Sequence, residues 1–151
     1  MKQLTAVFCF MFLASASLKA QADRIIGFWL NDDGKAQIEI YKVDGNKYNG
    51  RIVWLSEPFE DDGSVKVDKE NPDRSLRNQP IKGLEILKGF TYNTSKQEWE
   101  QGRIYDPDNG RTYDCYMSLD GHNTLKIRGF VLGMRWLGRS TEWTRERSLR
   151  E

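Results

Sequence analysis

The chain has 151 residues, with 23 lysines and arginines against 22 aspartates and glutamates. This length is typical of one domain around a single core. The near balance of charge gives no electrostatic reason to expect a nucleic acid or an anionic membrane as a partner.

The chain begins with the pattern of a secretory signal. Lys2 supplies a positive charge, residues 4–16 are apolar, and Ala20 and Ala22 offer small residues to a signal peptidase. The apolar stretch is shorter than the ~20 residues that a membrane-spanning helix needs. We therefore expect residues 1–22 to be a signal peptide, cleaved after Ala20 or Ala22, and the mature protein to be periplasmic or secreted without a membrane span.

Beyond the signal, apolar and polar residues alternate with a period of two, which is typical of antiparallel strands. The segment LGMRWL, residues 132–137, favours one helical turn, and the charged tail at residues 147–151 is expected to fray. The expected strands are residues 24–30, 36–43, 47–56, 83–92, 97–105, 111–119, 124–131 and 138–145.

Eight strands with mostly short connections predict an all-β domain over residues 23–146. The favoured architecture is a single antiparallel up-and-down barrel, whose interior has room for one ligand. A β-sandwich is the alternative, because periodicity alone does not exclude it. The long connection at residues 57–80 holds three of the four prolines, and we expect it to form a mouth or lid. The five tryptophans either fill the core or line a cavity.

The segment RIYDPDNGRTYDC, residues 103–115, has an acidic cluster that looks at first like a calcium loop. Counted from Asp106, an EF-hand loop needs a ligand at position 5, glycine at 6 and glutamate at 12. Gly110, Arg111 and Met117 occupy those positions. We interpret the segment as a hairpin, since Asp-Pro starts turns and Asn-Gly tolerates left-handed backbone, with its tyrosines on the barrel wall. No metal and no cofactor are expected.

Few residues suit catalysis. His122 is the only histidine and lies in the turn sequence DGHN, where it has no evident nucleophile. The other cysteine, Cys9, lies in the expected signal, so Cys115 has no partner for a disulfide and alternates with apolar residues as a buried side chain would. We assign no catalytic residue, and an enzyme is the less favoured interpretation.

Several segments resemble the bacterial domain of unknown function 2147. They are IGFWL followed by IEIY, NGRIVWL, DKENPDRSLRNQPIKGLEILKGF, WEQGRIYDPDNGRTYDCYMSL, TLKIRGFV and LGRSTEWTR. Together they cover nearly all of the expected mature chain, in order. The resemblance implies a small secreted or periplasmic bacterial domain, and it brings no catalytic residues with it.

The tripeptide Gly27-Phe28-Trp29 looks like the Gly-x-Trp signature of lipocalins and related calycin barrels. In those proteins the tryptophan closes one barrel end beneath a basic residue from the last strand. The resemblance implies that Arg145, or with less support Arg139, lies over Trp29 in a structural role. The chain departs from lipocalins in its long loop after the third strand and in having no disulfide, so a lipocalin ligand does not follow.

The first functional hypothesis is a carrier that binds a small apolar or amphipathic ligand inside the barrel. Its expected ligand-binding residues are Asp68, Asn71 and Arg77 in the long loop, with Trp54 and Tyr92 on the strands. One alternative is a cell-envelope interaction module, whose filled barrel presents loops to a protein or glycan. Another is an enzyme in which Asp68 and Arg77 converge at the mouth. The interior decides between them, because a filled barrel leaves the carrier without a site.

Overall fold

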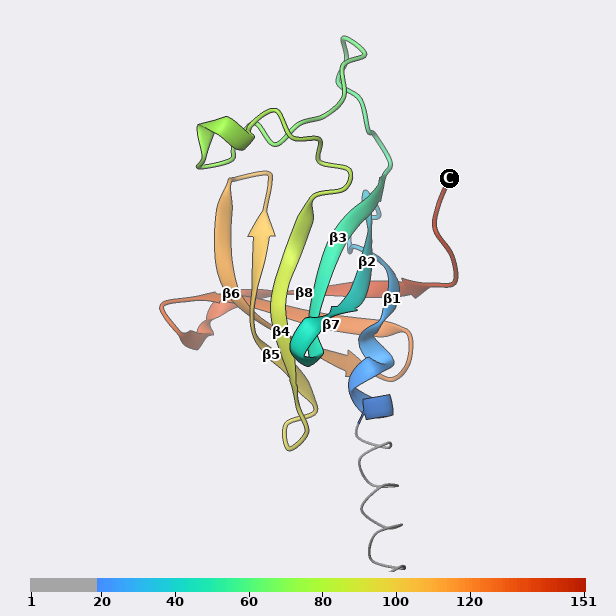
Figure 1. Cartoon of the computed structure of the whole chain (residues 1–151), viewed down its shortest axis with the longest axis vertical. Coiled ribbons are helices and arrows are strands. Elements are labelled where there is room, and N and C mark those ends of the chain that lie inside the picture. The colour runs from blue at the N-terminus through green and yellow to red at the C-terminus, as the bar shows by residue number, and fades with distance from the viewer. Residues whose placement is uncertain (1–18) are drawn as a thin grey trace, which may run out of the picture.

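The structure is a computed structural model that describes residues 19–151, so most of the expected signal peptide lies outside the described residues. Eight antiparallel strands close into one barrel, in which each strand pairs with its chain neighbours and β8 pairs with β1 (Figure 1). The strands are β1 (Gly27–Leu30), β2 (Ala36–Val43), β3 (Lys47–Leu55), β4 (Glu85–Asn93), β5 (Glu98–Asp106), β6 (Arg111–Asp120), β7 (Thr124–Val131) and β8 (Met134–Glu146). The predicted eight-stranded up-and-down barrel is confirmed.

Residues 19–22 are helical, and the described residues also contain three short 3₁₀ turns: η1 (Asp23–Ile25), η2 (Asp44–Asn46) and η3 (Arg74–Leu76). The first replaces the start of the expected strand at residues 24–30, which begins only at Gly27. No helix within residues 19–151 is long and apolar enough to cross a membrane.

Large apolar side chains fill the barrel end that carries the β2–β3, β4–β5 and β6–β7 turns. The fully buried ones are Trp29, Ile40, Tyr48, Leu87, Phe90, Trp99, Met117 and Leu125. Gly102 leaves room for this packing, since a Cβ there would overlap the ring of Phe90. We call this the closed end and the opposite one the mouth.

Trp29 closes this end together with Arg145. The indole N–H of Trp29 donates to the Ile25 carbonyl at 2.9 Å, and the guanidinium carbon of Arg145 lies 4.1 Å from the indole centroid. A Cβ on Gly27 would lie 3.0 Å from Nη1 of Arg145. Glycine therefore allows the guanidinium to approach the ring, which gives the Gly-x-Trp pattern a physical reason.

The expected helical turn at residues 132–137 is wrong. A two-residue turn, Leu132 and Gly133, joins β7 to β8, and Val131 pairs with Met134 across it. Both turn residues have positive φ, 57° and 69°, which suits a tight hairpin and not a right-handed helix.

The expectation that the C-terminal tail frays is also wrong. Gln37 is fully buried, and its side chain bonds the Ser148 carbonyl and the Arg150 backbone N–H. Arg150 also pairs with Glu146. The tail therefore packs along the outside of the barrel, where it adds two hydrogen bonds to a buried amide that also donates to Glu146 at the end of β8.

Candidate functional site

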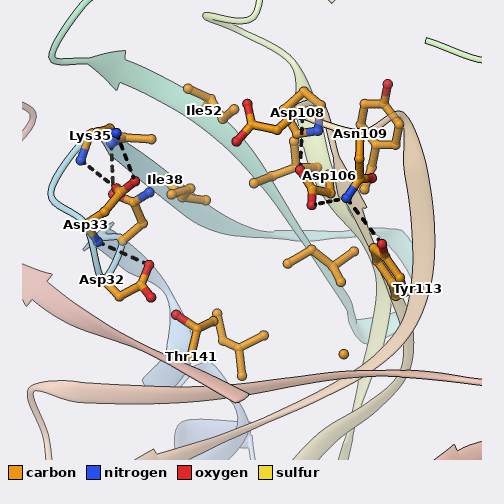
Figure 2. Close-up of a pocket in the computed structure, with 18 of the residues that line it drawn as sticks. Asp32, Asp33, Lys35, Ile38, Ile52, Asp106, Asp108, Asn109, Tyr113 and Thr141 are labelled. Atoms are coloured by element: carbon orange, nitrogen blue, oxygen red, sulfur yellow. Dashed lines mark hydrogen bonds and ion pairs between the residues drawn. The ribbon is translucent and has the colours of Figure 1, made fainter. Parts of the chain in front are cut away.

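A cavity of about 960 Å³ opens at the mouth of the barrel. Its lining comes from three connections at that end, β1–β2, β3–β4 and β5–β6, and from the strands, including β7 and β8. Figure 2 shows the β1–β2 turn and the β5–β6 turn facing each other across it. The interior is therefore filled at one end and open at the other, unlike that of a filled interaction module.

The deep part of the cavity is apolar. Its buried lining residues are Ile38, Ile52, Ile86, Ile127 and Trp143. One polar atom interrupts this surface: the Oγ1 of Thr141 is buried and has no hydrogen-bond partner within residues 19–151. Figure 2 shows Thr141 on the β8 side of the cavity. An unpaired buried hydroxyl is costly, so a bound molecule with a polar group would relieve it.

The rim is polar, but many of its acids shape turns. The Asp33 carboxylate accepts from the Lys35 backbone N–H at 3.0 Å. Asp106 accepts from the Asp108 backbone N–H and the Asn109 side-chain amide. The rim charges without a turn role include Arg111 and Arg139, for which residues 19–151 provide no ion pair.

The segment of residues 103–115 forms the predicted hairpin, and its sequence has a second use. Gly110 has φ of 68°, and its N–H bonds the Asp106 carbonyl at 2.9 Å. A Cβ on Gly110 would overlap the carbonyl oxygen of Glu70. Glycine thus serves both the turn and the approach of the long loop. Within the described residues, no three His, Cys, Asp or Glu side chains gather to hold a metal ion.

Asp68, Asn71 and Arg77 come together in the long loop. Asp68 is fully buried and accepts hydrogen bonds from the hydroxyl of Tyr105, at 2.8 and 2.9 Å, and from the Asn71 amide, at 2.7 Å. Arg77 Nε donates to the Asn71 carbonyl at 2.7 Å. None of the three lines the cavity. They fix the loop to β5 instead, and Tyr105, which does line the cavity, links them to it.

Tyr105 and Tyr113 both line the cavity, in agreement with their expected place on the barrel wall. Burial raises the pKa of the Tyr105 phenol, and its hydrogen bond to Asp68 raises that pKa further. The phenol therefore stays protonated and acts as a donor to the buried carboxylate near neutral pH.

Trp54 does not line the cavity. A β-bulge lies between the pairs Gln37–Trp54 and Ile38–Ile52, so Val53 has no opposite residue and alternation breaks there. The indole N–H of Trp54 donates to the Glu151 carbonyl in the tail. Strict alternation would put Trp54 on the same side of the strand as Ile52. The bulge puts Trp54 on the outside instead, and no local sequence pattern predicts this bulge.

Tyr92 lies near the closed end, one residue before the end of β4. Its ring centroid is 4.8 Å from that of Trp99, and it is absent from the cavity lining. The residues that sequence reasoning missed are Thr141, Trp143 and the isoleucines of the floor. The period-two alternation of the strands predicts that these residues point inward. It does not predict which part of the interior holds the cavity.

Cys115 is buried beside the core and does not line the cavity. Burial raises the pKa of its thiol to about 12. A thiol with such a pKa carries little thiolate at neutral pH, so Cys115 acts as a small apolar side chain.

Comparison with known proteins supports the architecture. Residues 27–145 match the family described as "Uncharacterized protein conserved in bacteria (DUF2147)", and the chain belongs to this family. A solved structure from Helicobacter pylori, described as "Protein HP1028 from the human pathogen Helicobacter pylori belongs to the lipocalin family", is similar with a TM-score of 0.68. It is 23% identical, over 82% of this chain and 83% of that one. At this identity the likeness shows the fold alone. No curated protein matches.

Proposed function

We propose that this DUF2147 protein binds a small apolar or amphipathic molecule in the cavity of its barrel. The observation that carries the proposal is the cavity itself, about 960 Å³ with an apolar floor. Sites for small molecules are typically concave, largely apolar and ~300–1,000 Å³ in volume, with a few polar groups that fix orientation. The interior meets each of these conditions.

Two polar features favour an amphipathic molecule over a pure hydrocarbon. The Thr141 hydroxyl in the wall offers one hydrogen bond that no described protein group makes. Arg111 and Arg139 at the rim offer positive charge. A ligand with an apolar body and polar groups would satisfy both the floor and the rim. Asp68, Asn71 and Arg77 support the same site indirectly, since they hold the loop and Tyr105 in place.

A substitution at Gly129 tests whether the cavity is the binding site. It lines the cavity, and a Cβ there would lie 3.6 Å from Cβ of Tyr113 and 3.7 Å from Cγ2 of Ile104, which are ordinary contacts. Its φ lies outside the left-handed region, so a larger residue fits the strand. We expect Gly129→Leu to occupy the cavity and to weaken binding of N-phenylnaphthylamine, an apolar fluorescent dye, roughly tenfold or more, as judged by fluorescence titration.

Lys126→Leu is the matched control, because it adds the same side chain to the same strand on the solvent side, where Lys126 pairs with Asp120. Its dye affinity should equal that of the unchanged protein. Native mass spectrometry of the protein purified from the bacterium should also show a persistent extra mass, which Gly129→Leu lacks. Equal dye binding by Gly129→Leu and the unchanged protein would refute the cavity as the site.

We further infer that the mature protein is periplasmic or secreted, on the strength of the signal pattern in residues 1–22. The expected result is that N-terminal sequencing of the protein from its own cells begins at Gln21 or Asp23. A protein that keeps Met1 and stays in the cytoplasmic fraction would contradict this location.

A further inference from the structure

The β7–β8 hairpin exposes large apolar side chains beside the mouth. Leu132 is 82% exposed and Trp136 is 75% exposed, with Val131 and Leu137 partly exposed next to them. We call these four residues the apolar tip. Figure 1 shows the hairpin, in orange-red, projecting to one side of the barrel. Val131 and Leu137 also line the cavity, so the tip is continuous with its entrance.

The backbone of the hairpin is built to display this tip. Phe130 pairs with Gly138 while Val131 pairs with Met134, so residues 135–137 of β8 bulge outward with no partner on β7. The guanidinium of Arg128 donates to the carbonyls of residues 135 and 136, at 2.6 and 3.0 Å, and so satisfies groups that the bulge releases. A Cβ on Gly138 would overlap the Gly129 carbonyl. The bulge is therefore encoded by the sequence, through Arg128 and Gly138.

Leu132 is an unfavourable choice for its position. It has φ of 57°, in the left-handed region where Asn and Gly are usual and a leucine side chain is strained. Its side chain is also almost fully in solvent. Neither turn geometry nor core packing accounts for leucine here, and strained residues cluster at functional positions.

The hairpin is also cationic. Between residues 124 and 141 the chain has Lys126, Arg128, Arg135 and Arg139 and no acidic residue. Arg135 pairs with Glu98 and Lys126 with Asp120 and Glu142, whereas Arg139 has no ion pair within residues 19–151. The net charge of the whole chain is only +1, so the overall composition does not reveal this local cluster of positive charge.

We propose that the apolar tip docks the protein on a bilayer that contains anionic lipids. Tryptophan and leucine enter the interfacial region of a membrane readily, and nearby arginines are attracted to its negative surface. A lipid surface fits better than an acidic protein groove, because a small protruding tip inserts among lipids without a shaped partner. Docking brings the cavity mouth to the membrane, so an apolar ligand enters or leaves without crossing water.

Co-sedimentation with vesicles tests this. The unchanged protein should bind vesicles of phosphatidylglycerol mixed with phosphatidylcholine, more weakly those of phosphatidylcholine alone, and less as salt increases. The double variant Leu132→Asn with Trp136→Ser should lose roughly tenfold or more of the affinity, since both main apolar contacts are removed. Asn suits the left-handed turn position, so the fold should be kept. Leu149→Ser, which removes an exposed leucine of the tail, is the control and should bind as before.

The two proposals fail separately. Without vesicles, the double variant should bind N-phenylnaphthylamine as the unchanged protein does, whereas Gly129→Leu should lose the dye and keep its vesicle binding. No vesicle binding by the unchanged protein, or equal binding by the double variant, overturns membrane docking. It is also overturned if the unchanged protein forms a dimer in analytical ultracentrifugation that the double variant abolishes, because a second copy then covers the tip.

Discussion

Replacing Trp29 with alanine is expected to lower the free energy of unfolding by about 3–5 kcal/mol, the range for removing a large aromatic from a core. Trp29 is fully buried at the closed end and donates to the Ile25 carbonyl. Its loss would also leave the guanidinium of Arg145 without the indole face beneath it. Arg145 has no carboxylate partner within residues 19–151 and bonds three backbone carbonyls, of His122, Ile26 and Arg24. Urea unfolding followed by circular dichroism measures the change.

Trp136→Ala is the matched control for this variant. It makes the same substitution at a tryptophan that is 75% exposed, so the expected change is within about 0.5 kcal/mol. Trp54→Ala should fall between the two, because Trp54 is half-buried against the tail and donates one hydrogen bond to it. If Trp29→Ala lowers the free energy of unfolding no more than Trp136→Ala does, the stability of the closed end does not depend on Trp29.

The strands were predictable because half-buried strands must alternate, and turn residues mark where they stop. Each expected strand corresponds to an observed one, and the architecture followed from their number and short connections. The wrong predictions of secondary structure concern segments whose local sequence fits more than one conformation. At residues 132–137, apolar residues without alternation suggested a helical turn, but the bulge on β8 explains that pattern. The tail looked solvated because its partner, Gln37, lies far away in sequence.

The site was predictable only in part. The loop residues Asp68, Asn71 and Arg77, which were expected to bind a ligand, form one hydrogen-bonded network outside the cavity lining. Their contact with Tyr105 depends on how the loop folds back over β5, which no local pattern encodes. The cavity depends on which inward positions near the mouth carry small or short side chains, such as Gly129 and Thr141. Which residues lie near the mouth is set by strand register, and register depends on bulges as well as alternation.

Removing the carboxylate of Asp68 is expected to detach the long loop from the barrel. Asp68→Ala leaves the Tyr105 hydroxyl and the Asn71 amide without their acceptor. Hydrogen bonds to charged groups contribute about 1.5–3 kcal/mol each, so loop opening should become easier by about 3 kcal/mol, or ~100-fold. Hydrogen exchange should report this at the backbone amides of positions 68 and 81, which donate to the carbonyls of Gln79 and Lys66 across the loop.

Asp73→Ala is the control in the same loop. Its exposed carboxylate caps Ser75, so its loss should speed exchange only near η3. Equal acceleration by both variants across the loop would show that Asp68 does not anchor it. The closed-end amides, such as those of β4 near Phe90, should exchange as in the unchanged protein, since the loop does not contact them.

The hydrogen bond from Tyr105 to Asp68 should also make the stability of the protein sensitive to alkaline pH. The pKa of Tyr105 is higher in the folded protein than in the unfolded chain, where it is about 10. The protonated phenol therefore stabilises the fold fully below about pH 10, and this contribution is lost as the pH rises through the folded pKa. Ionised Tyr105 would face the Asp68 carboxylate as a like charge. Because Tyr41 and Tyr48 also have raised pKa values, the comparison is with Tyr105→Phe. The difference in unfolding free energy between the two proteins should shrink above about pH 10, and a difference that stays constant would rule out this role for the phenol.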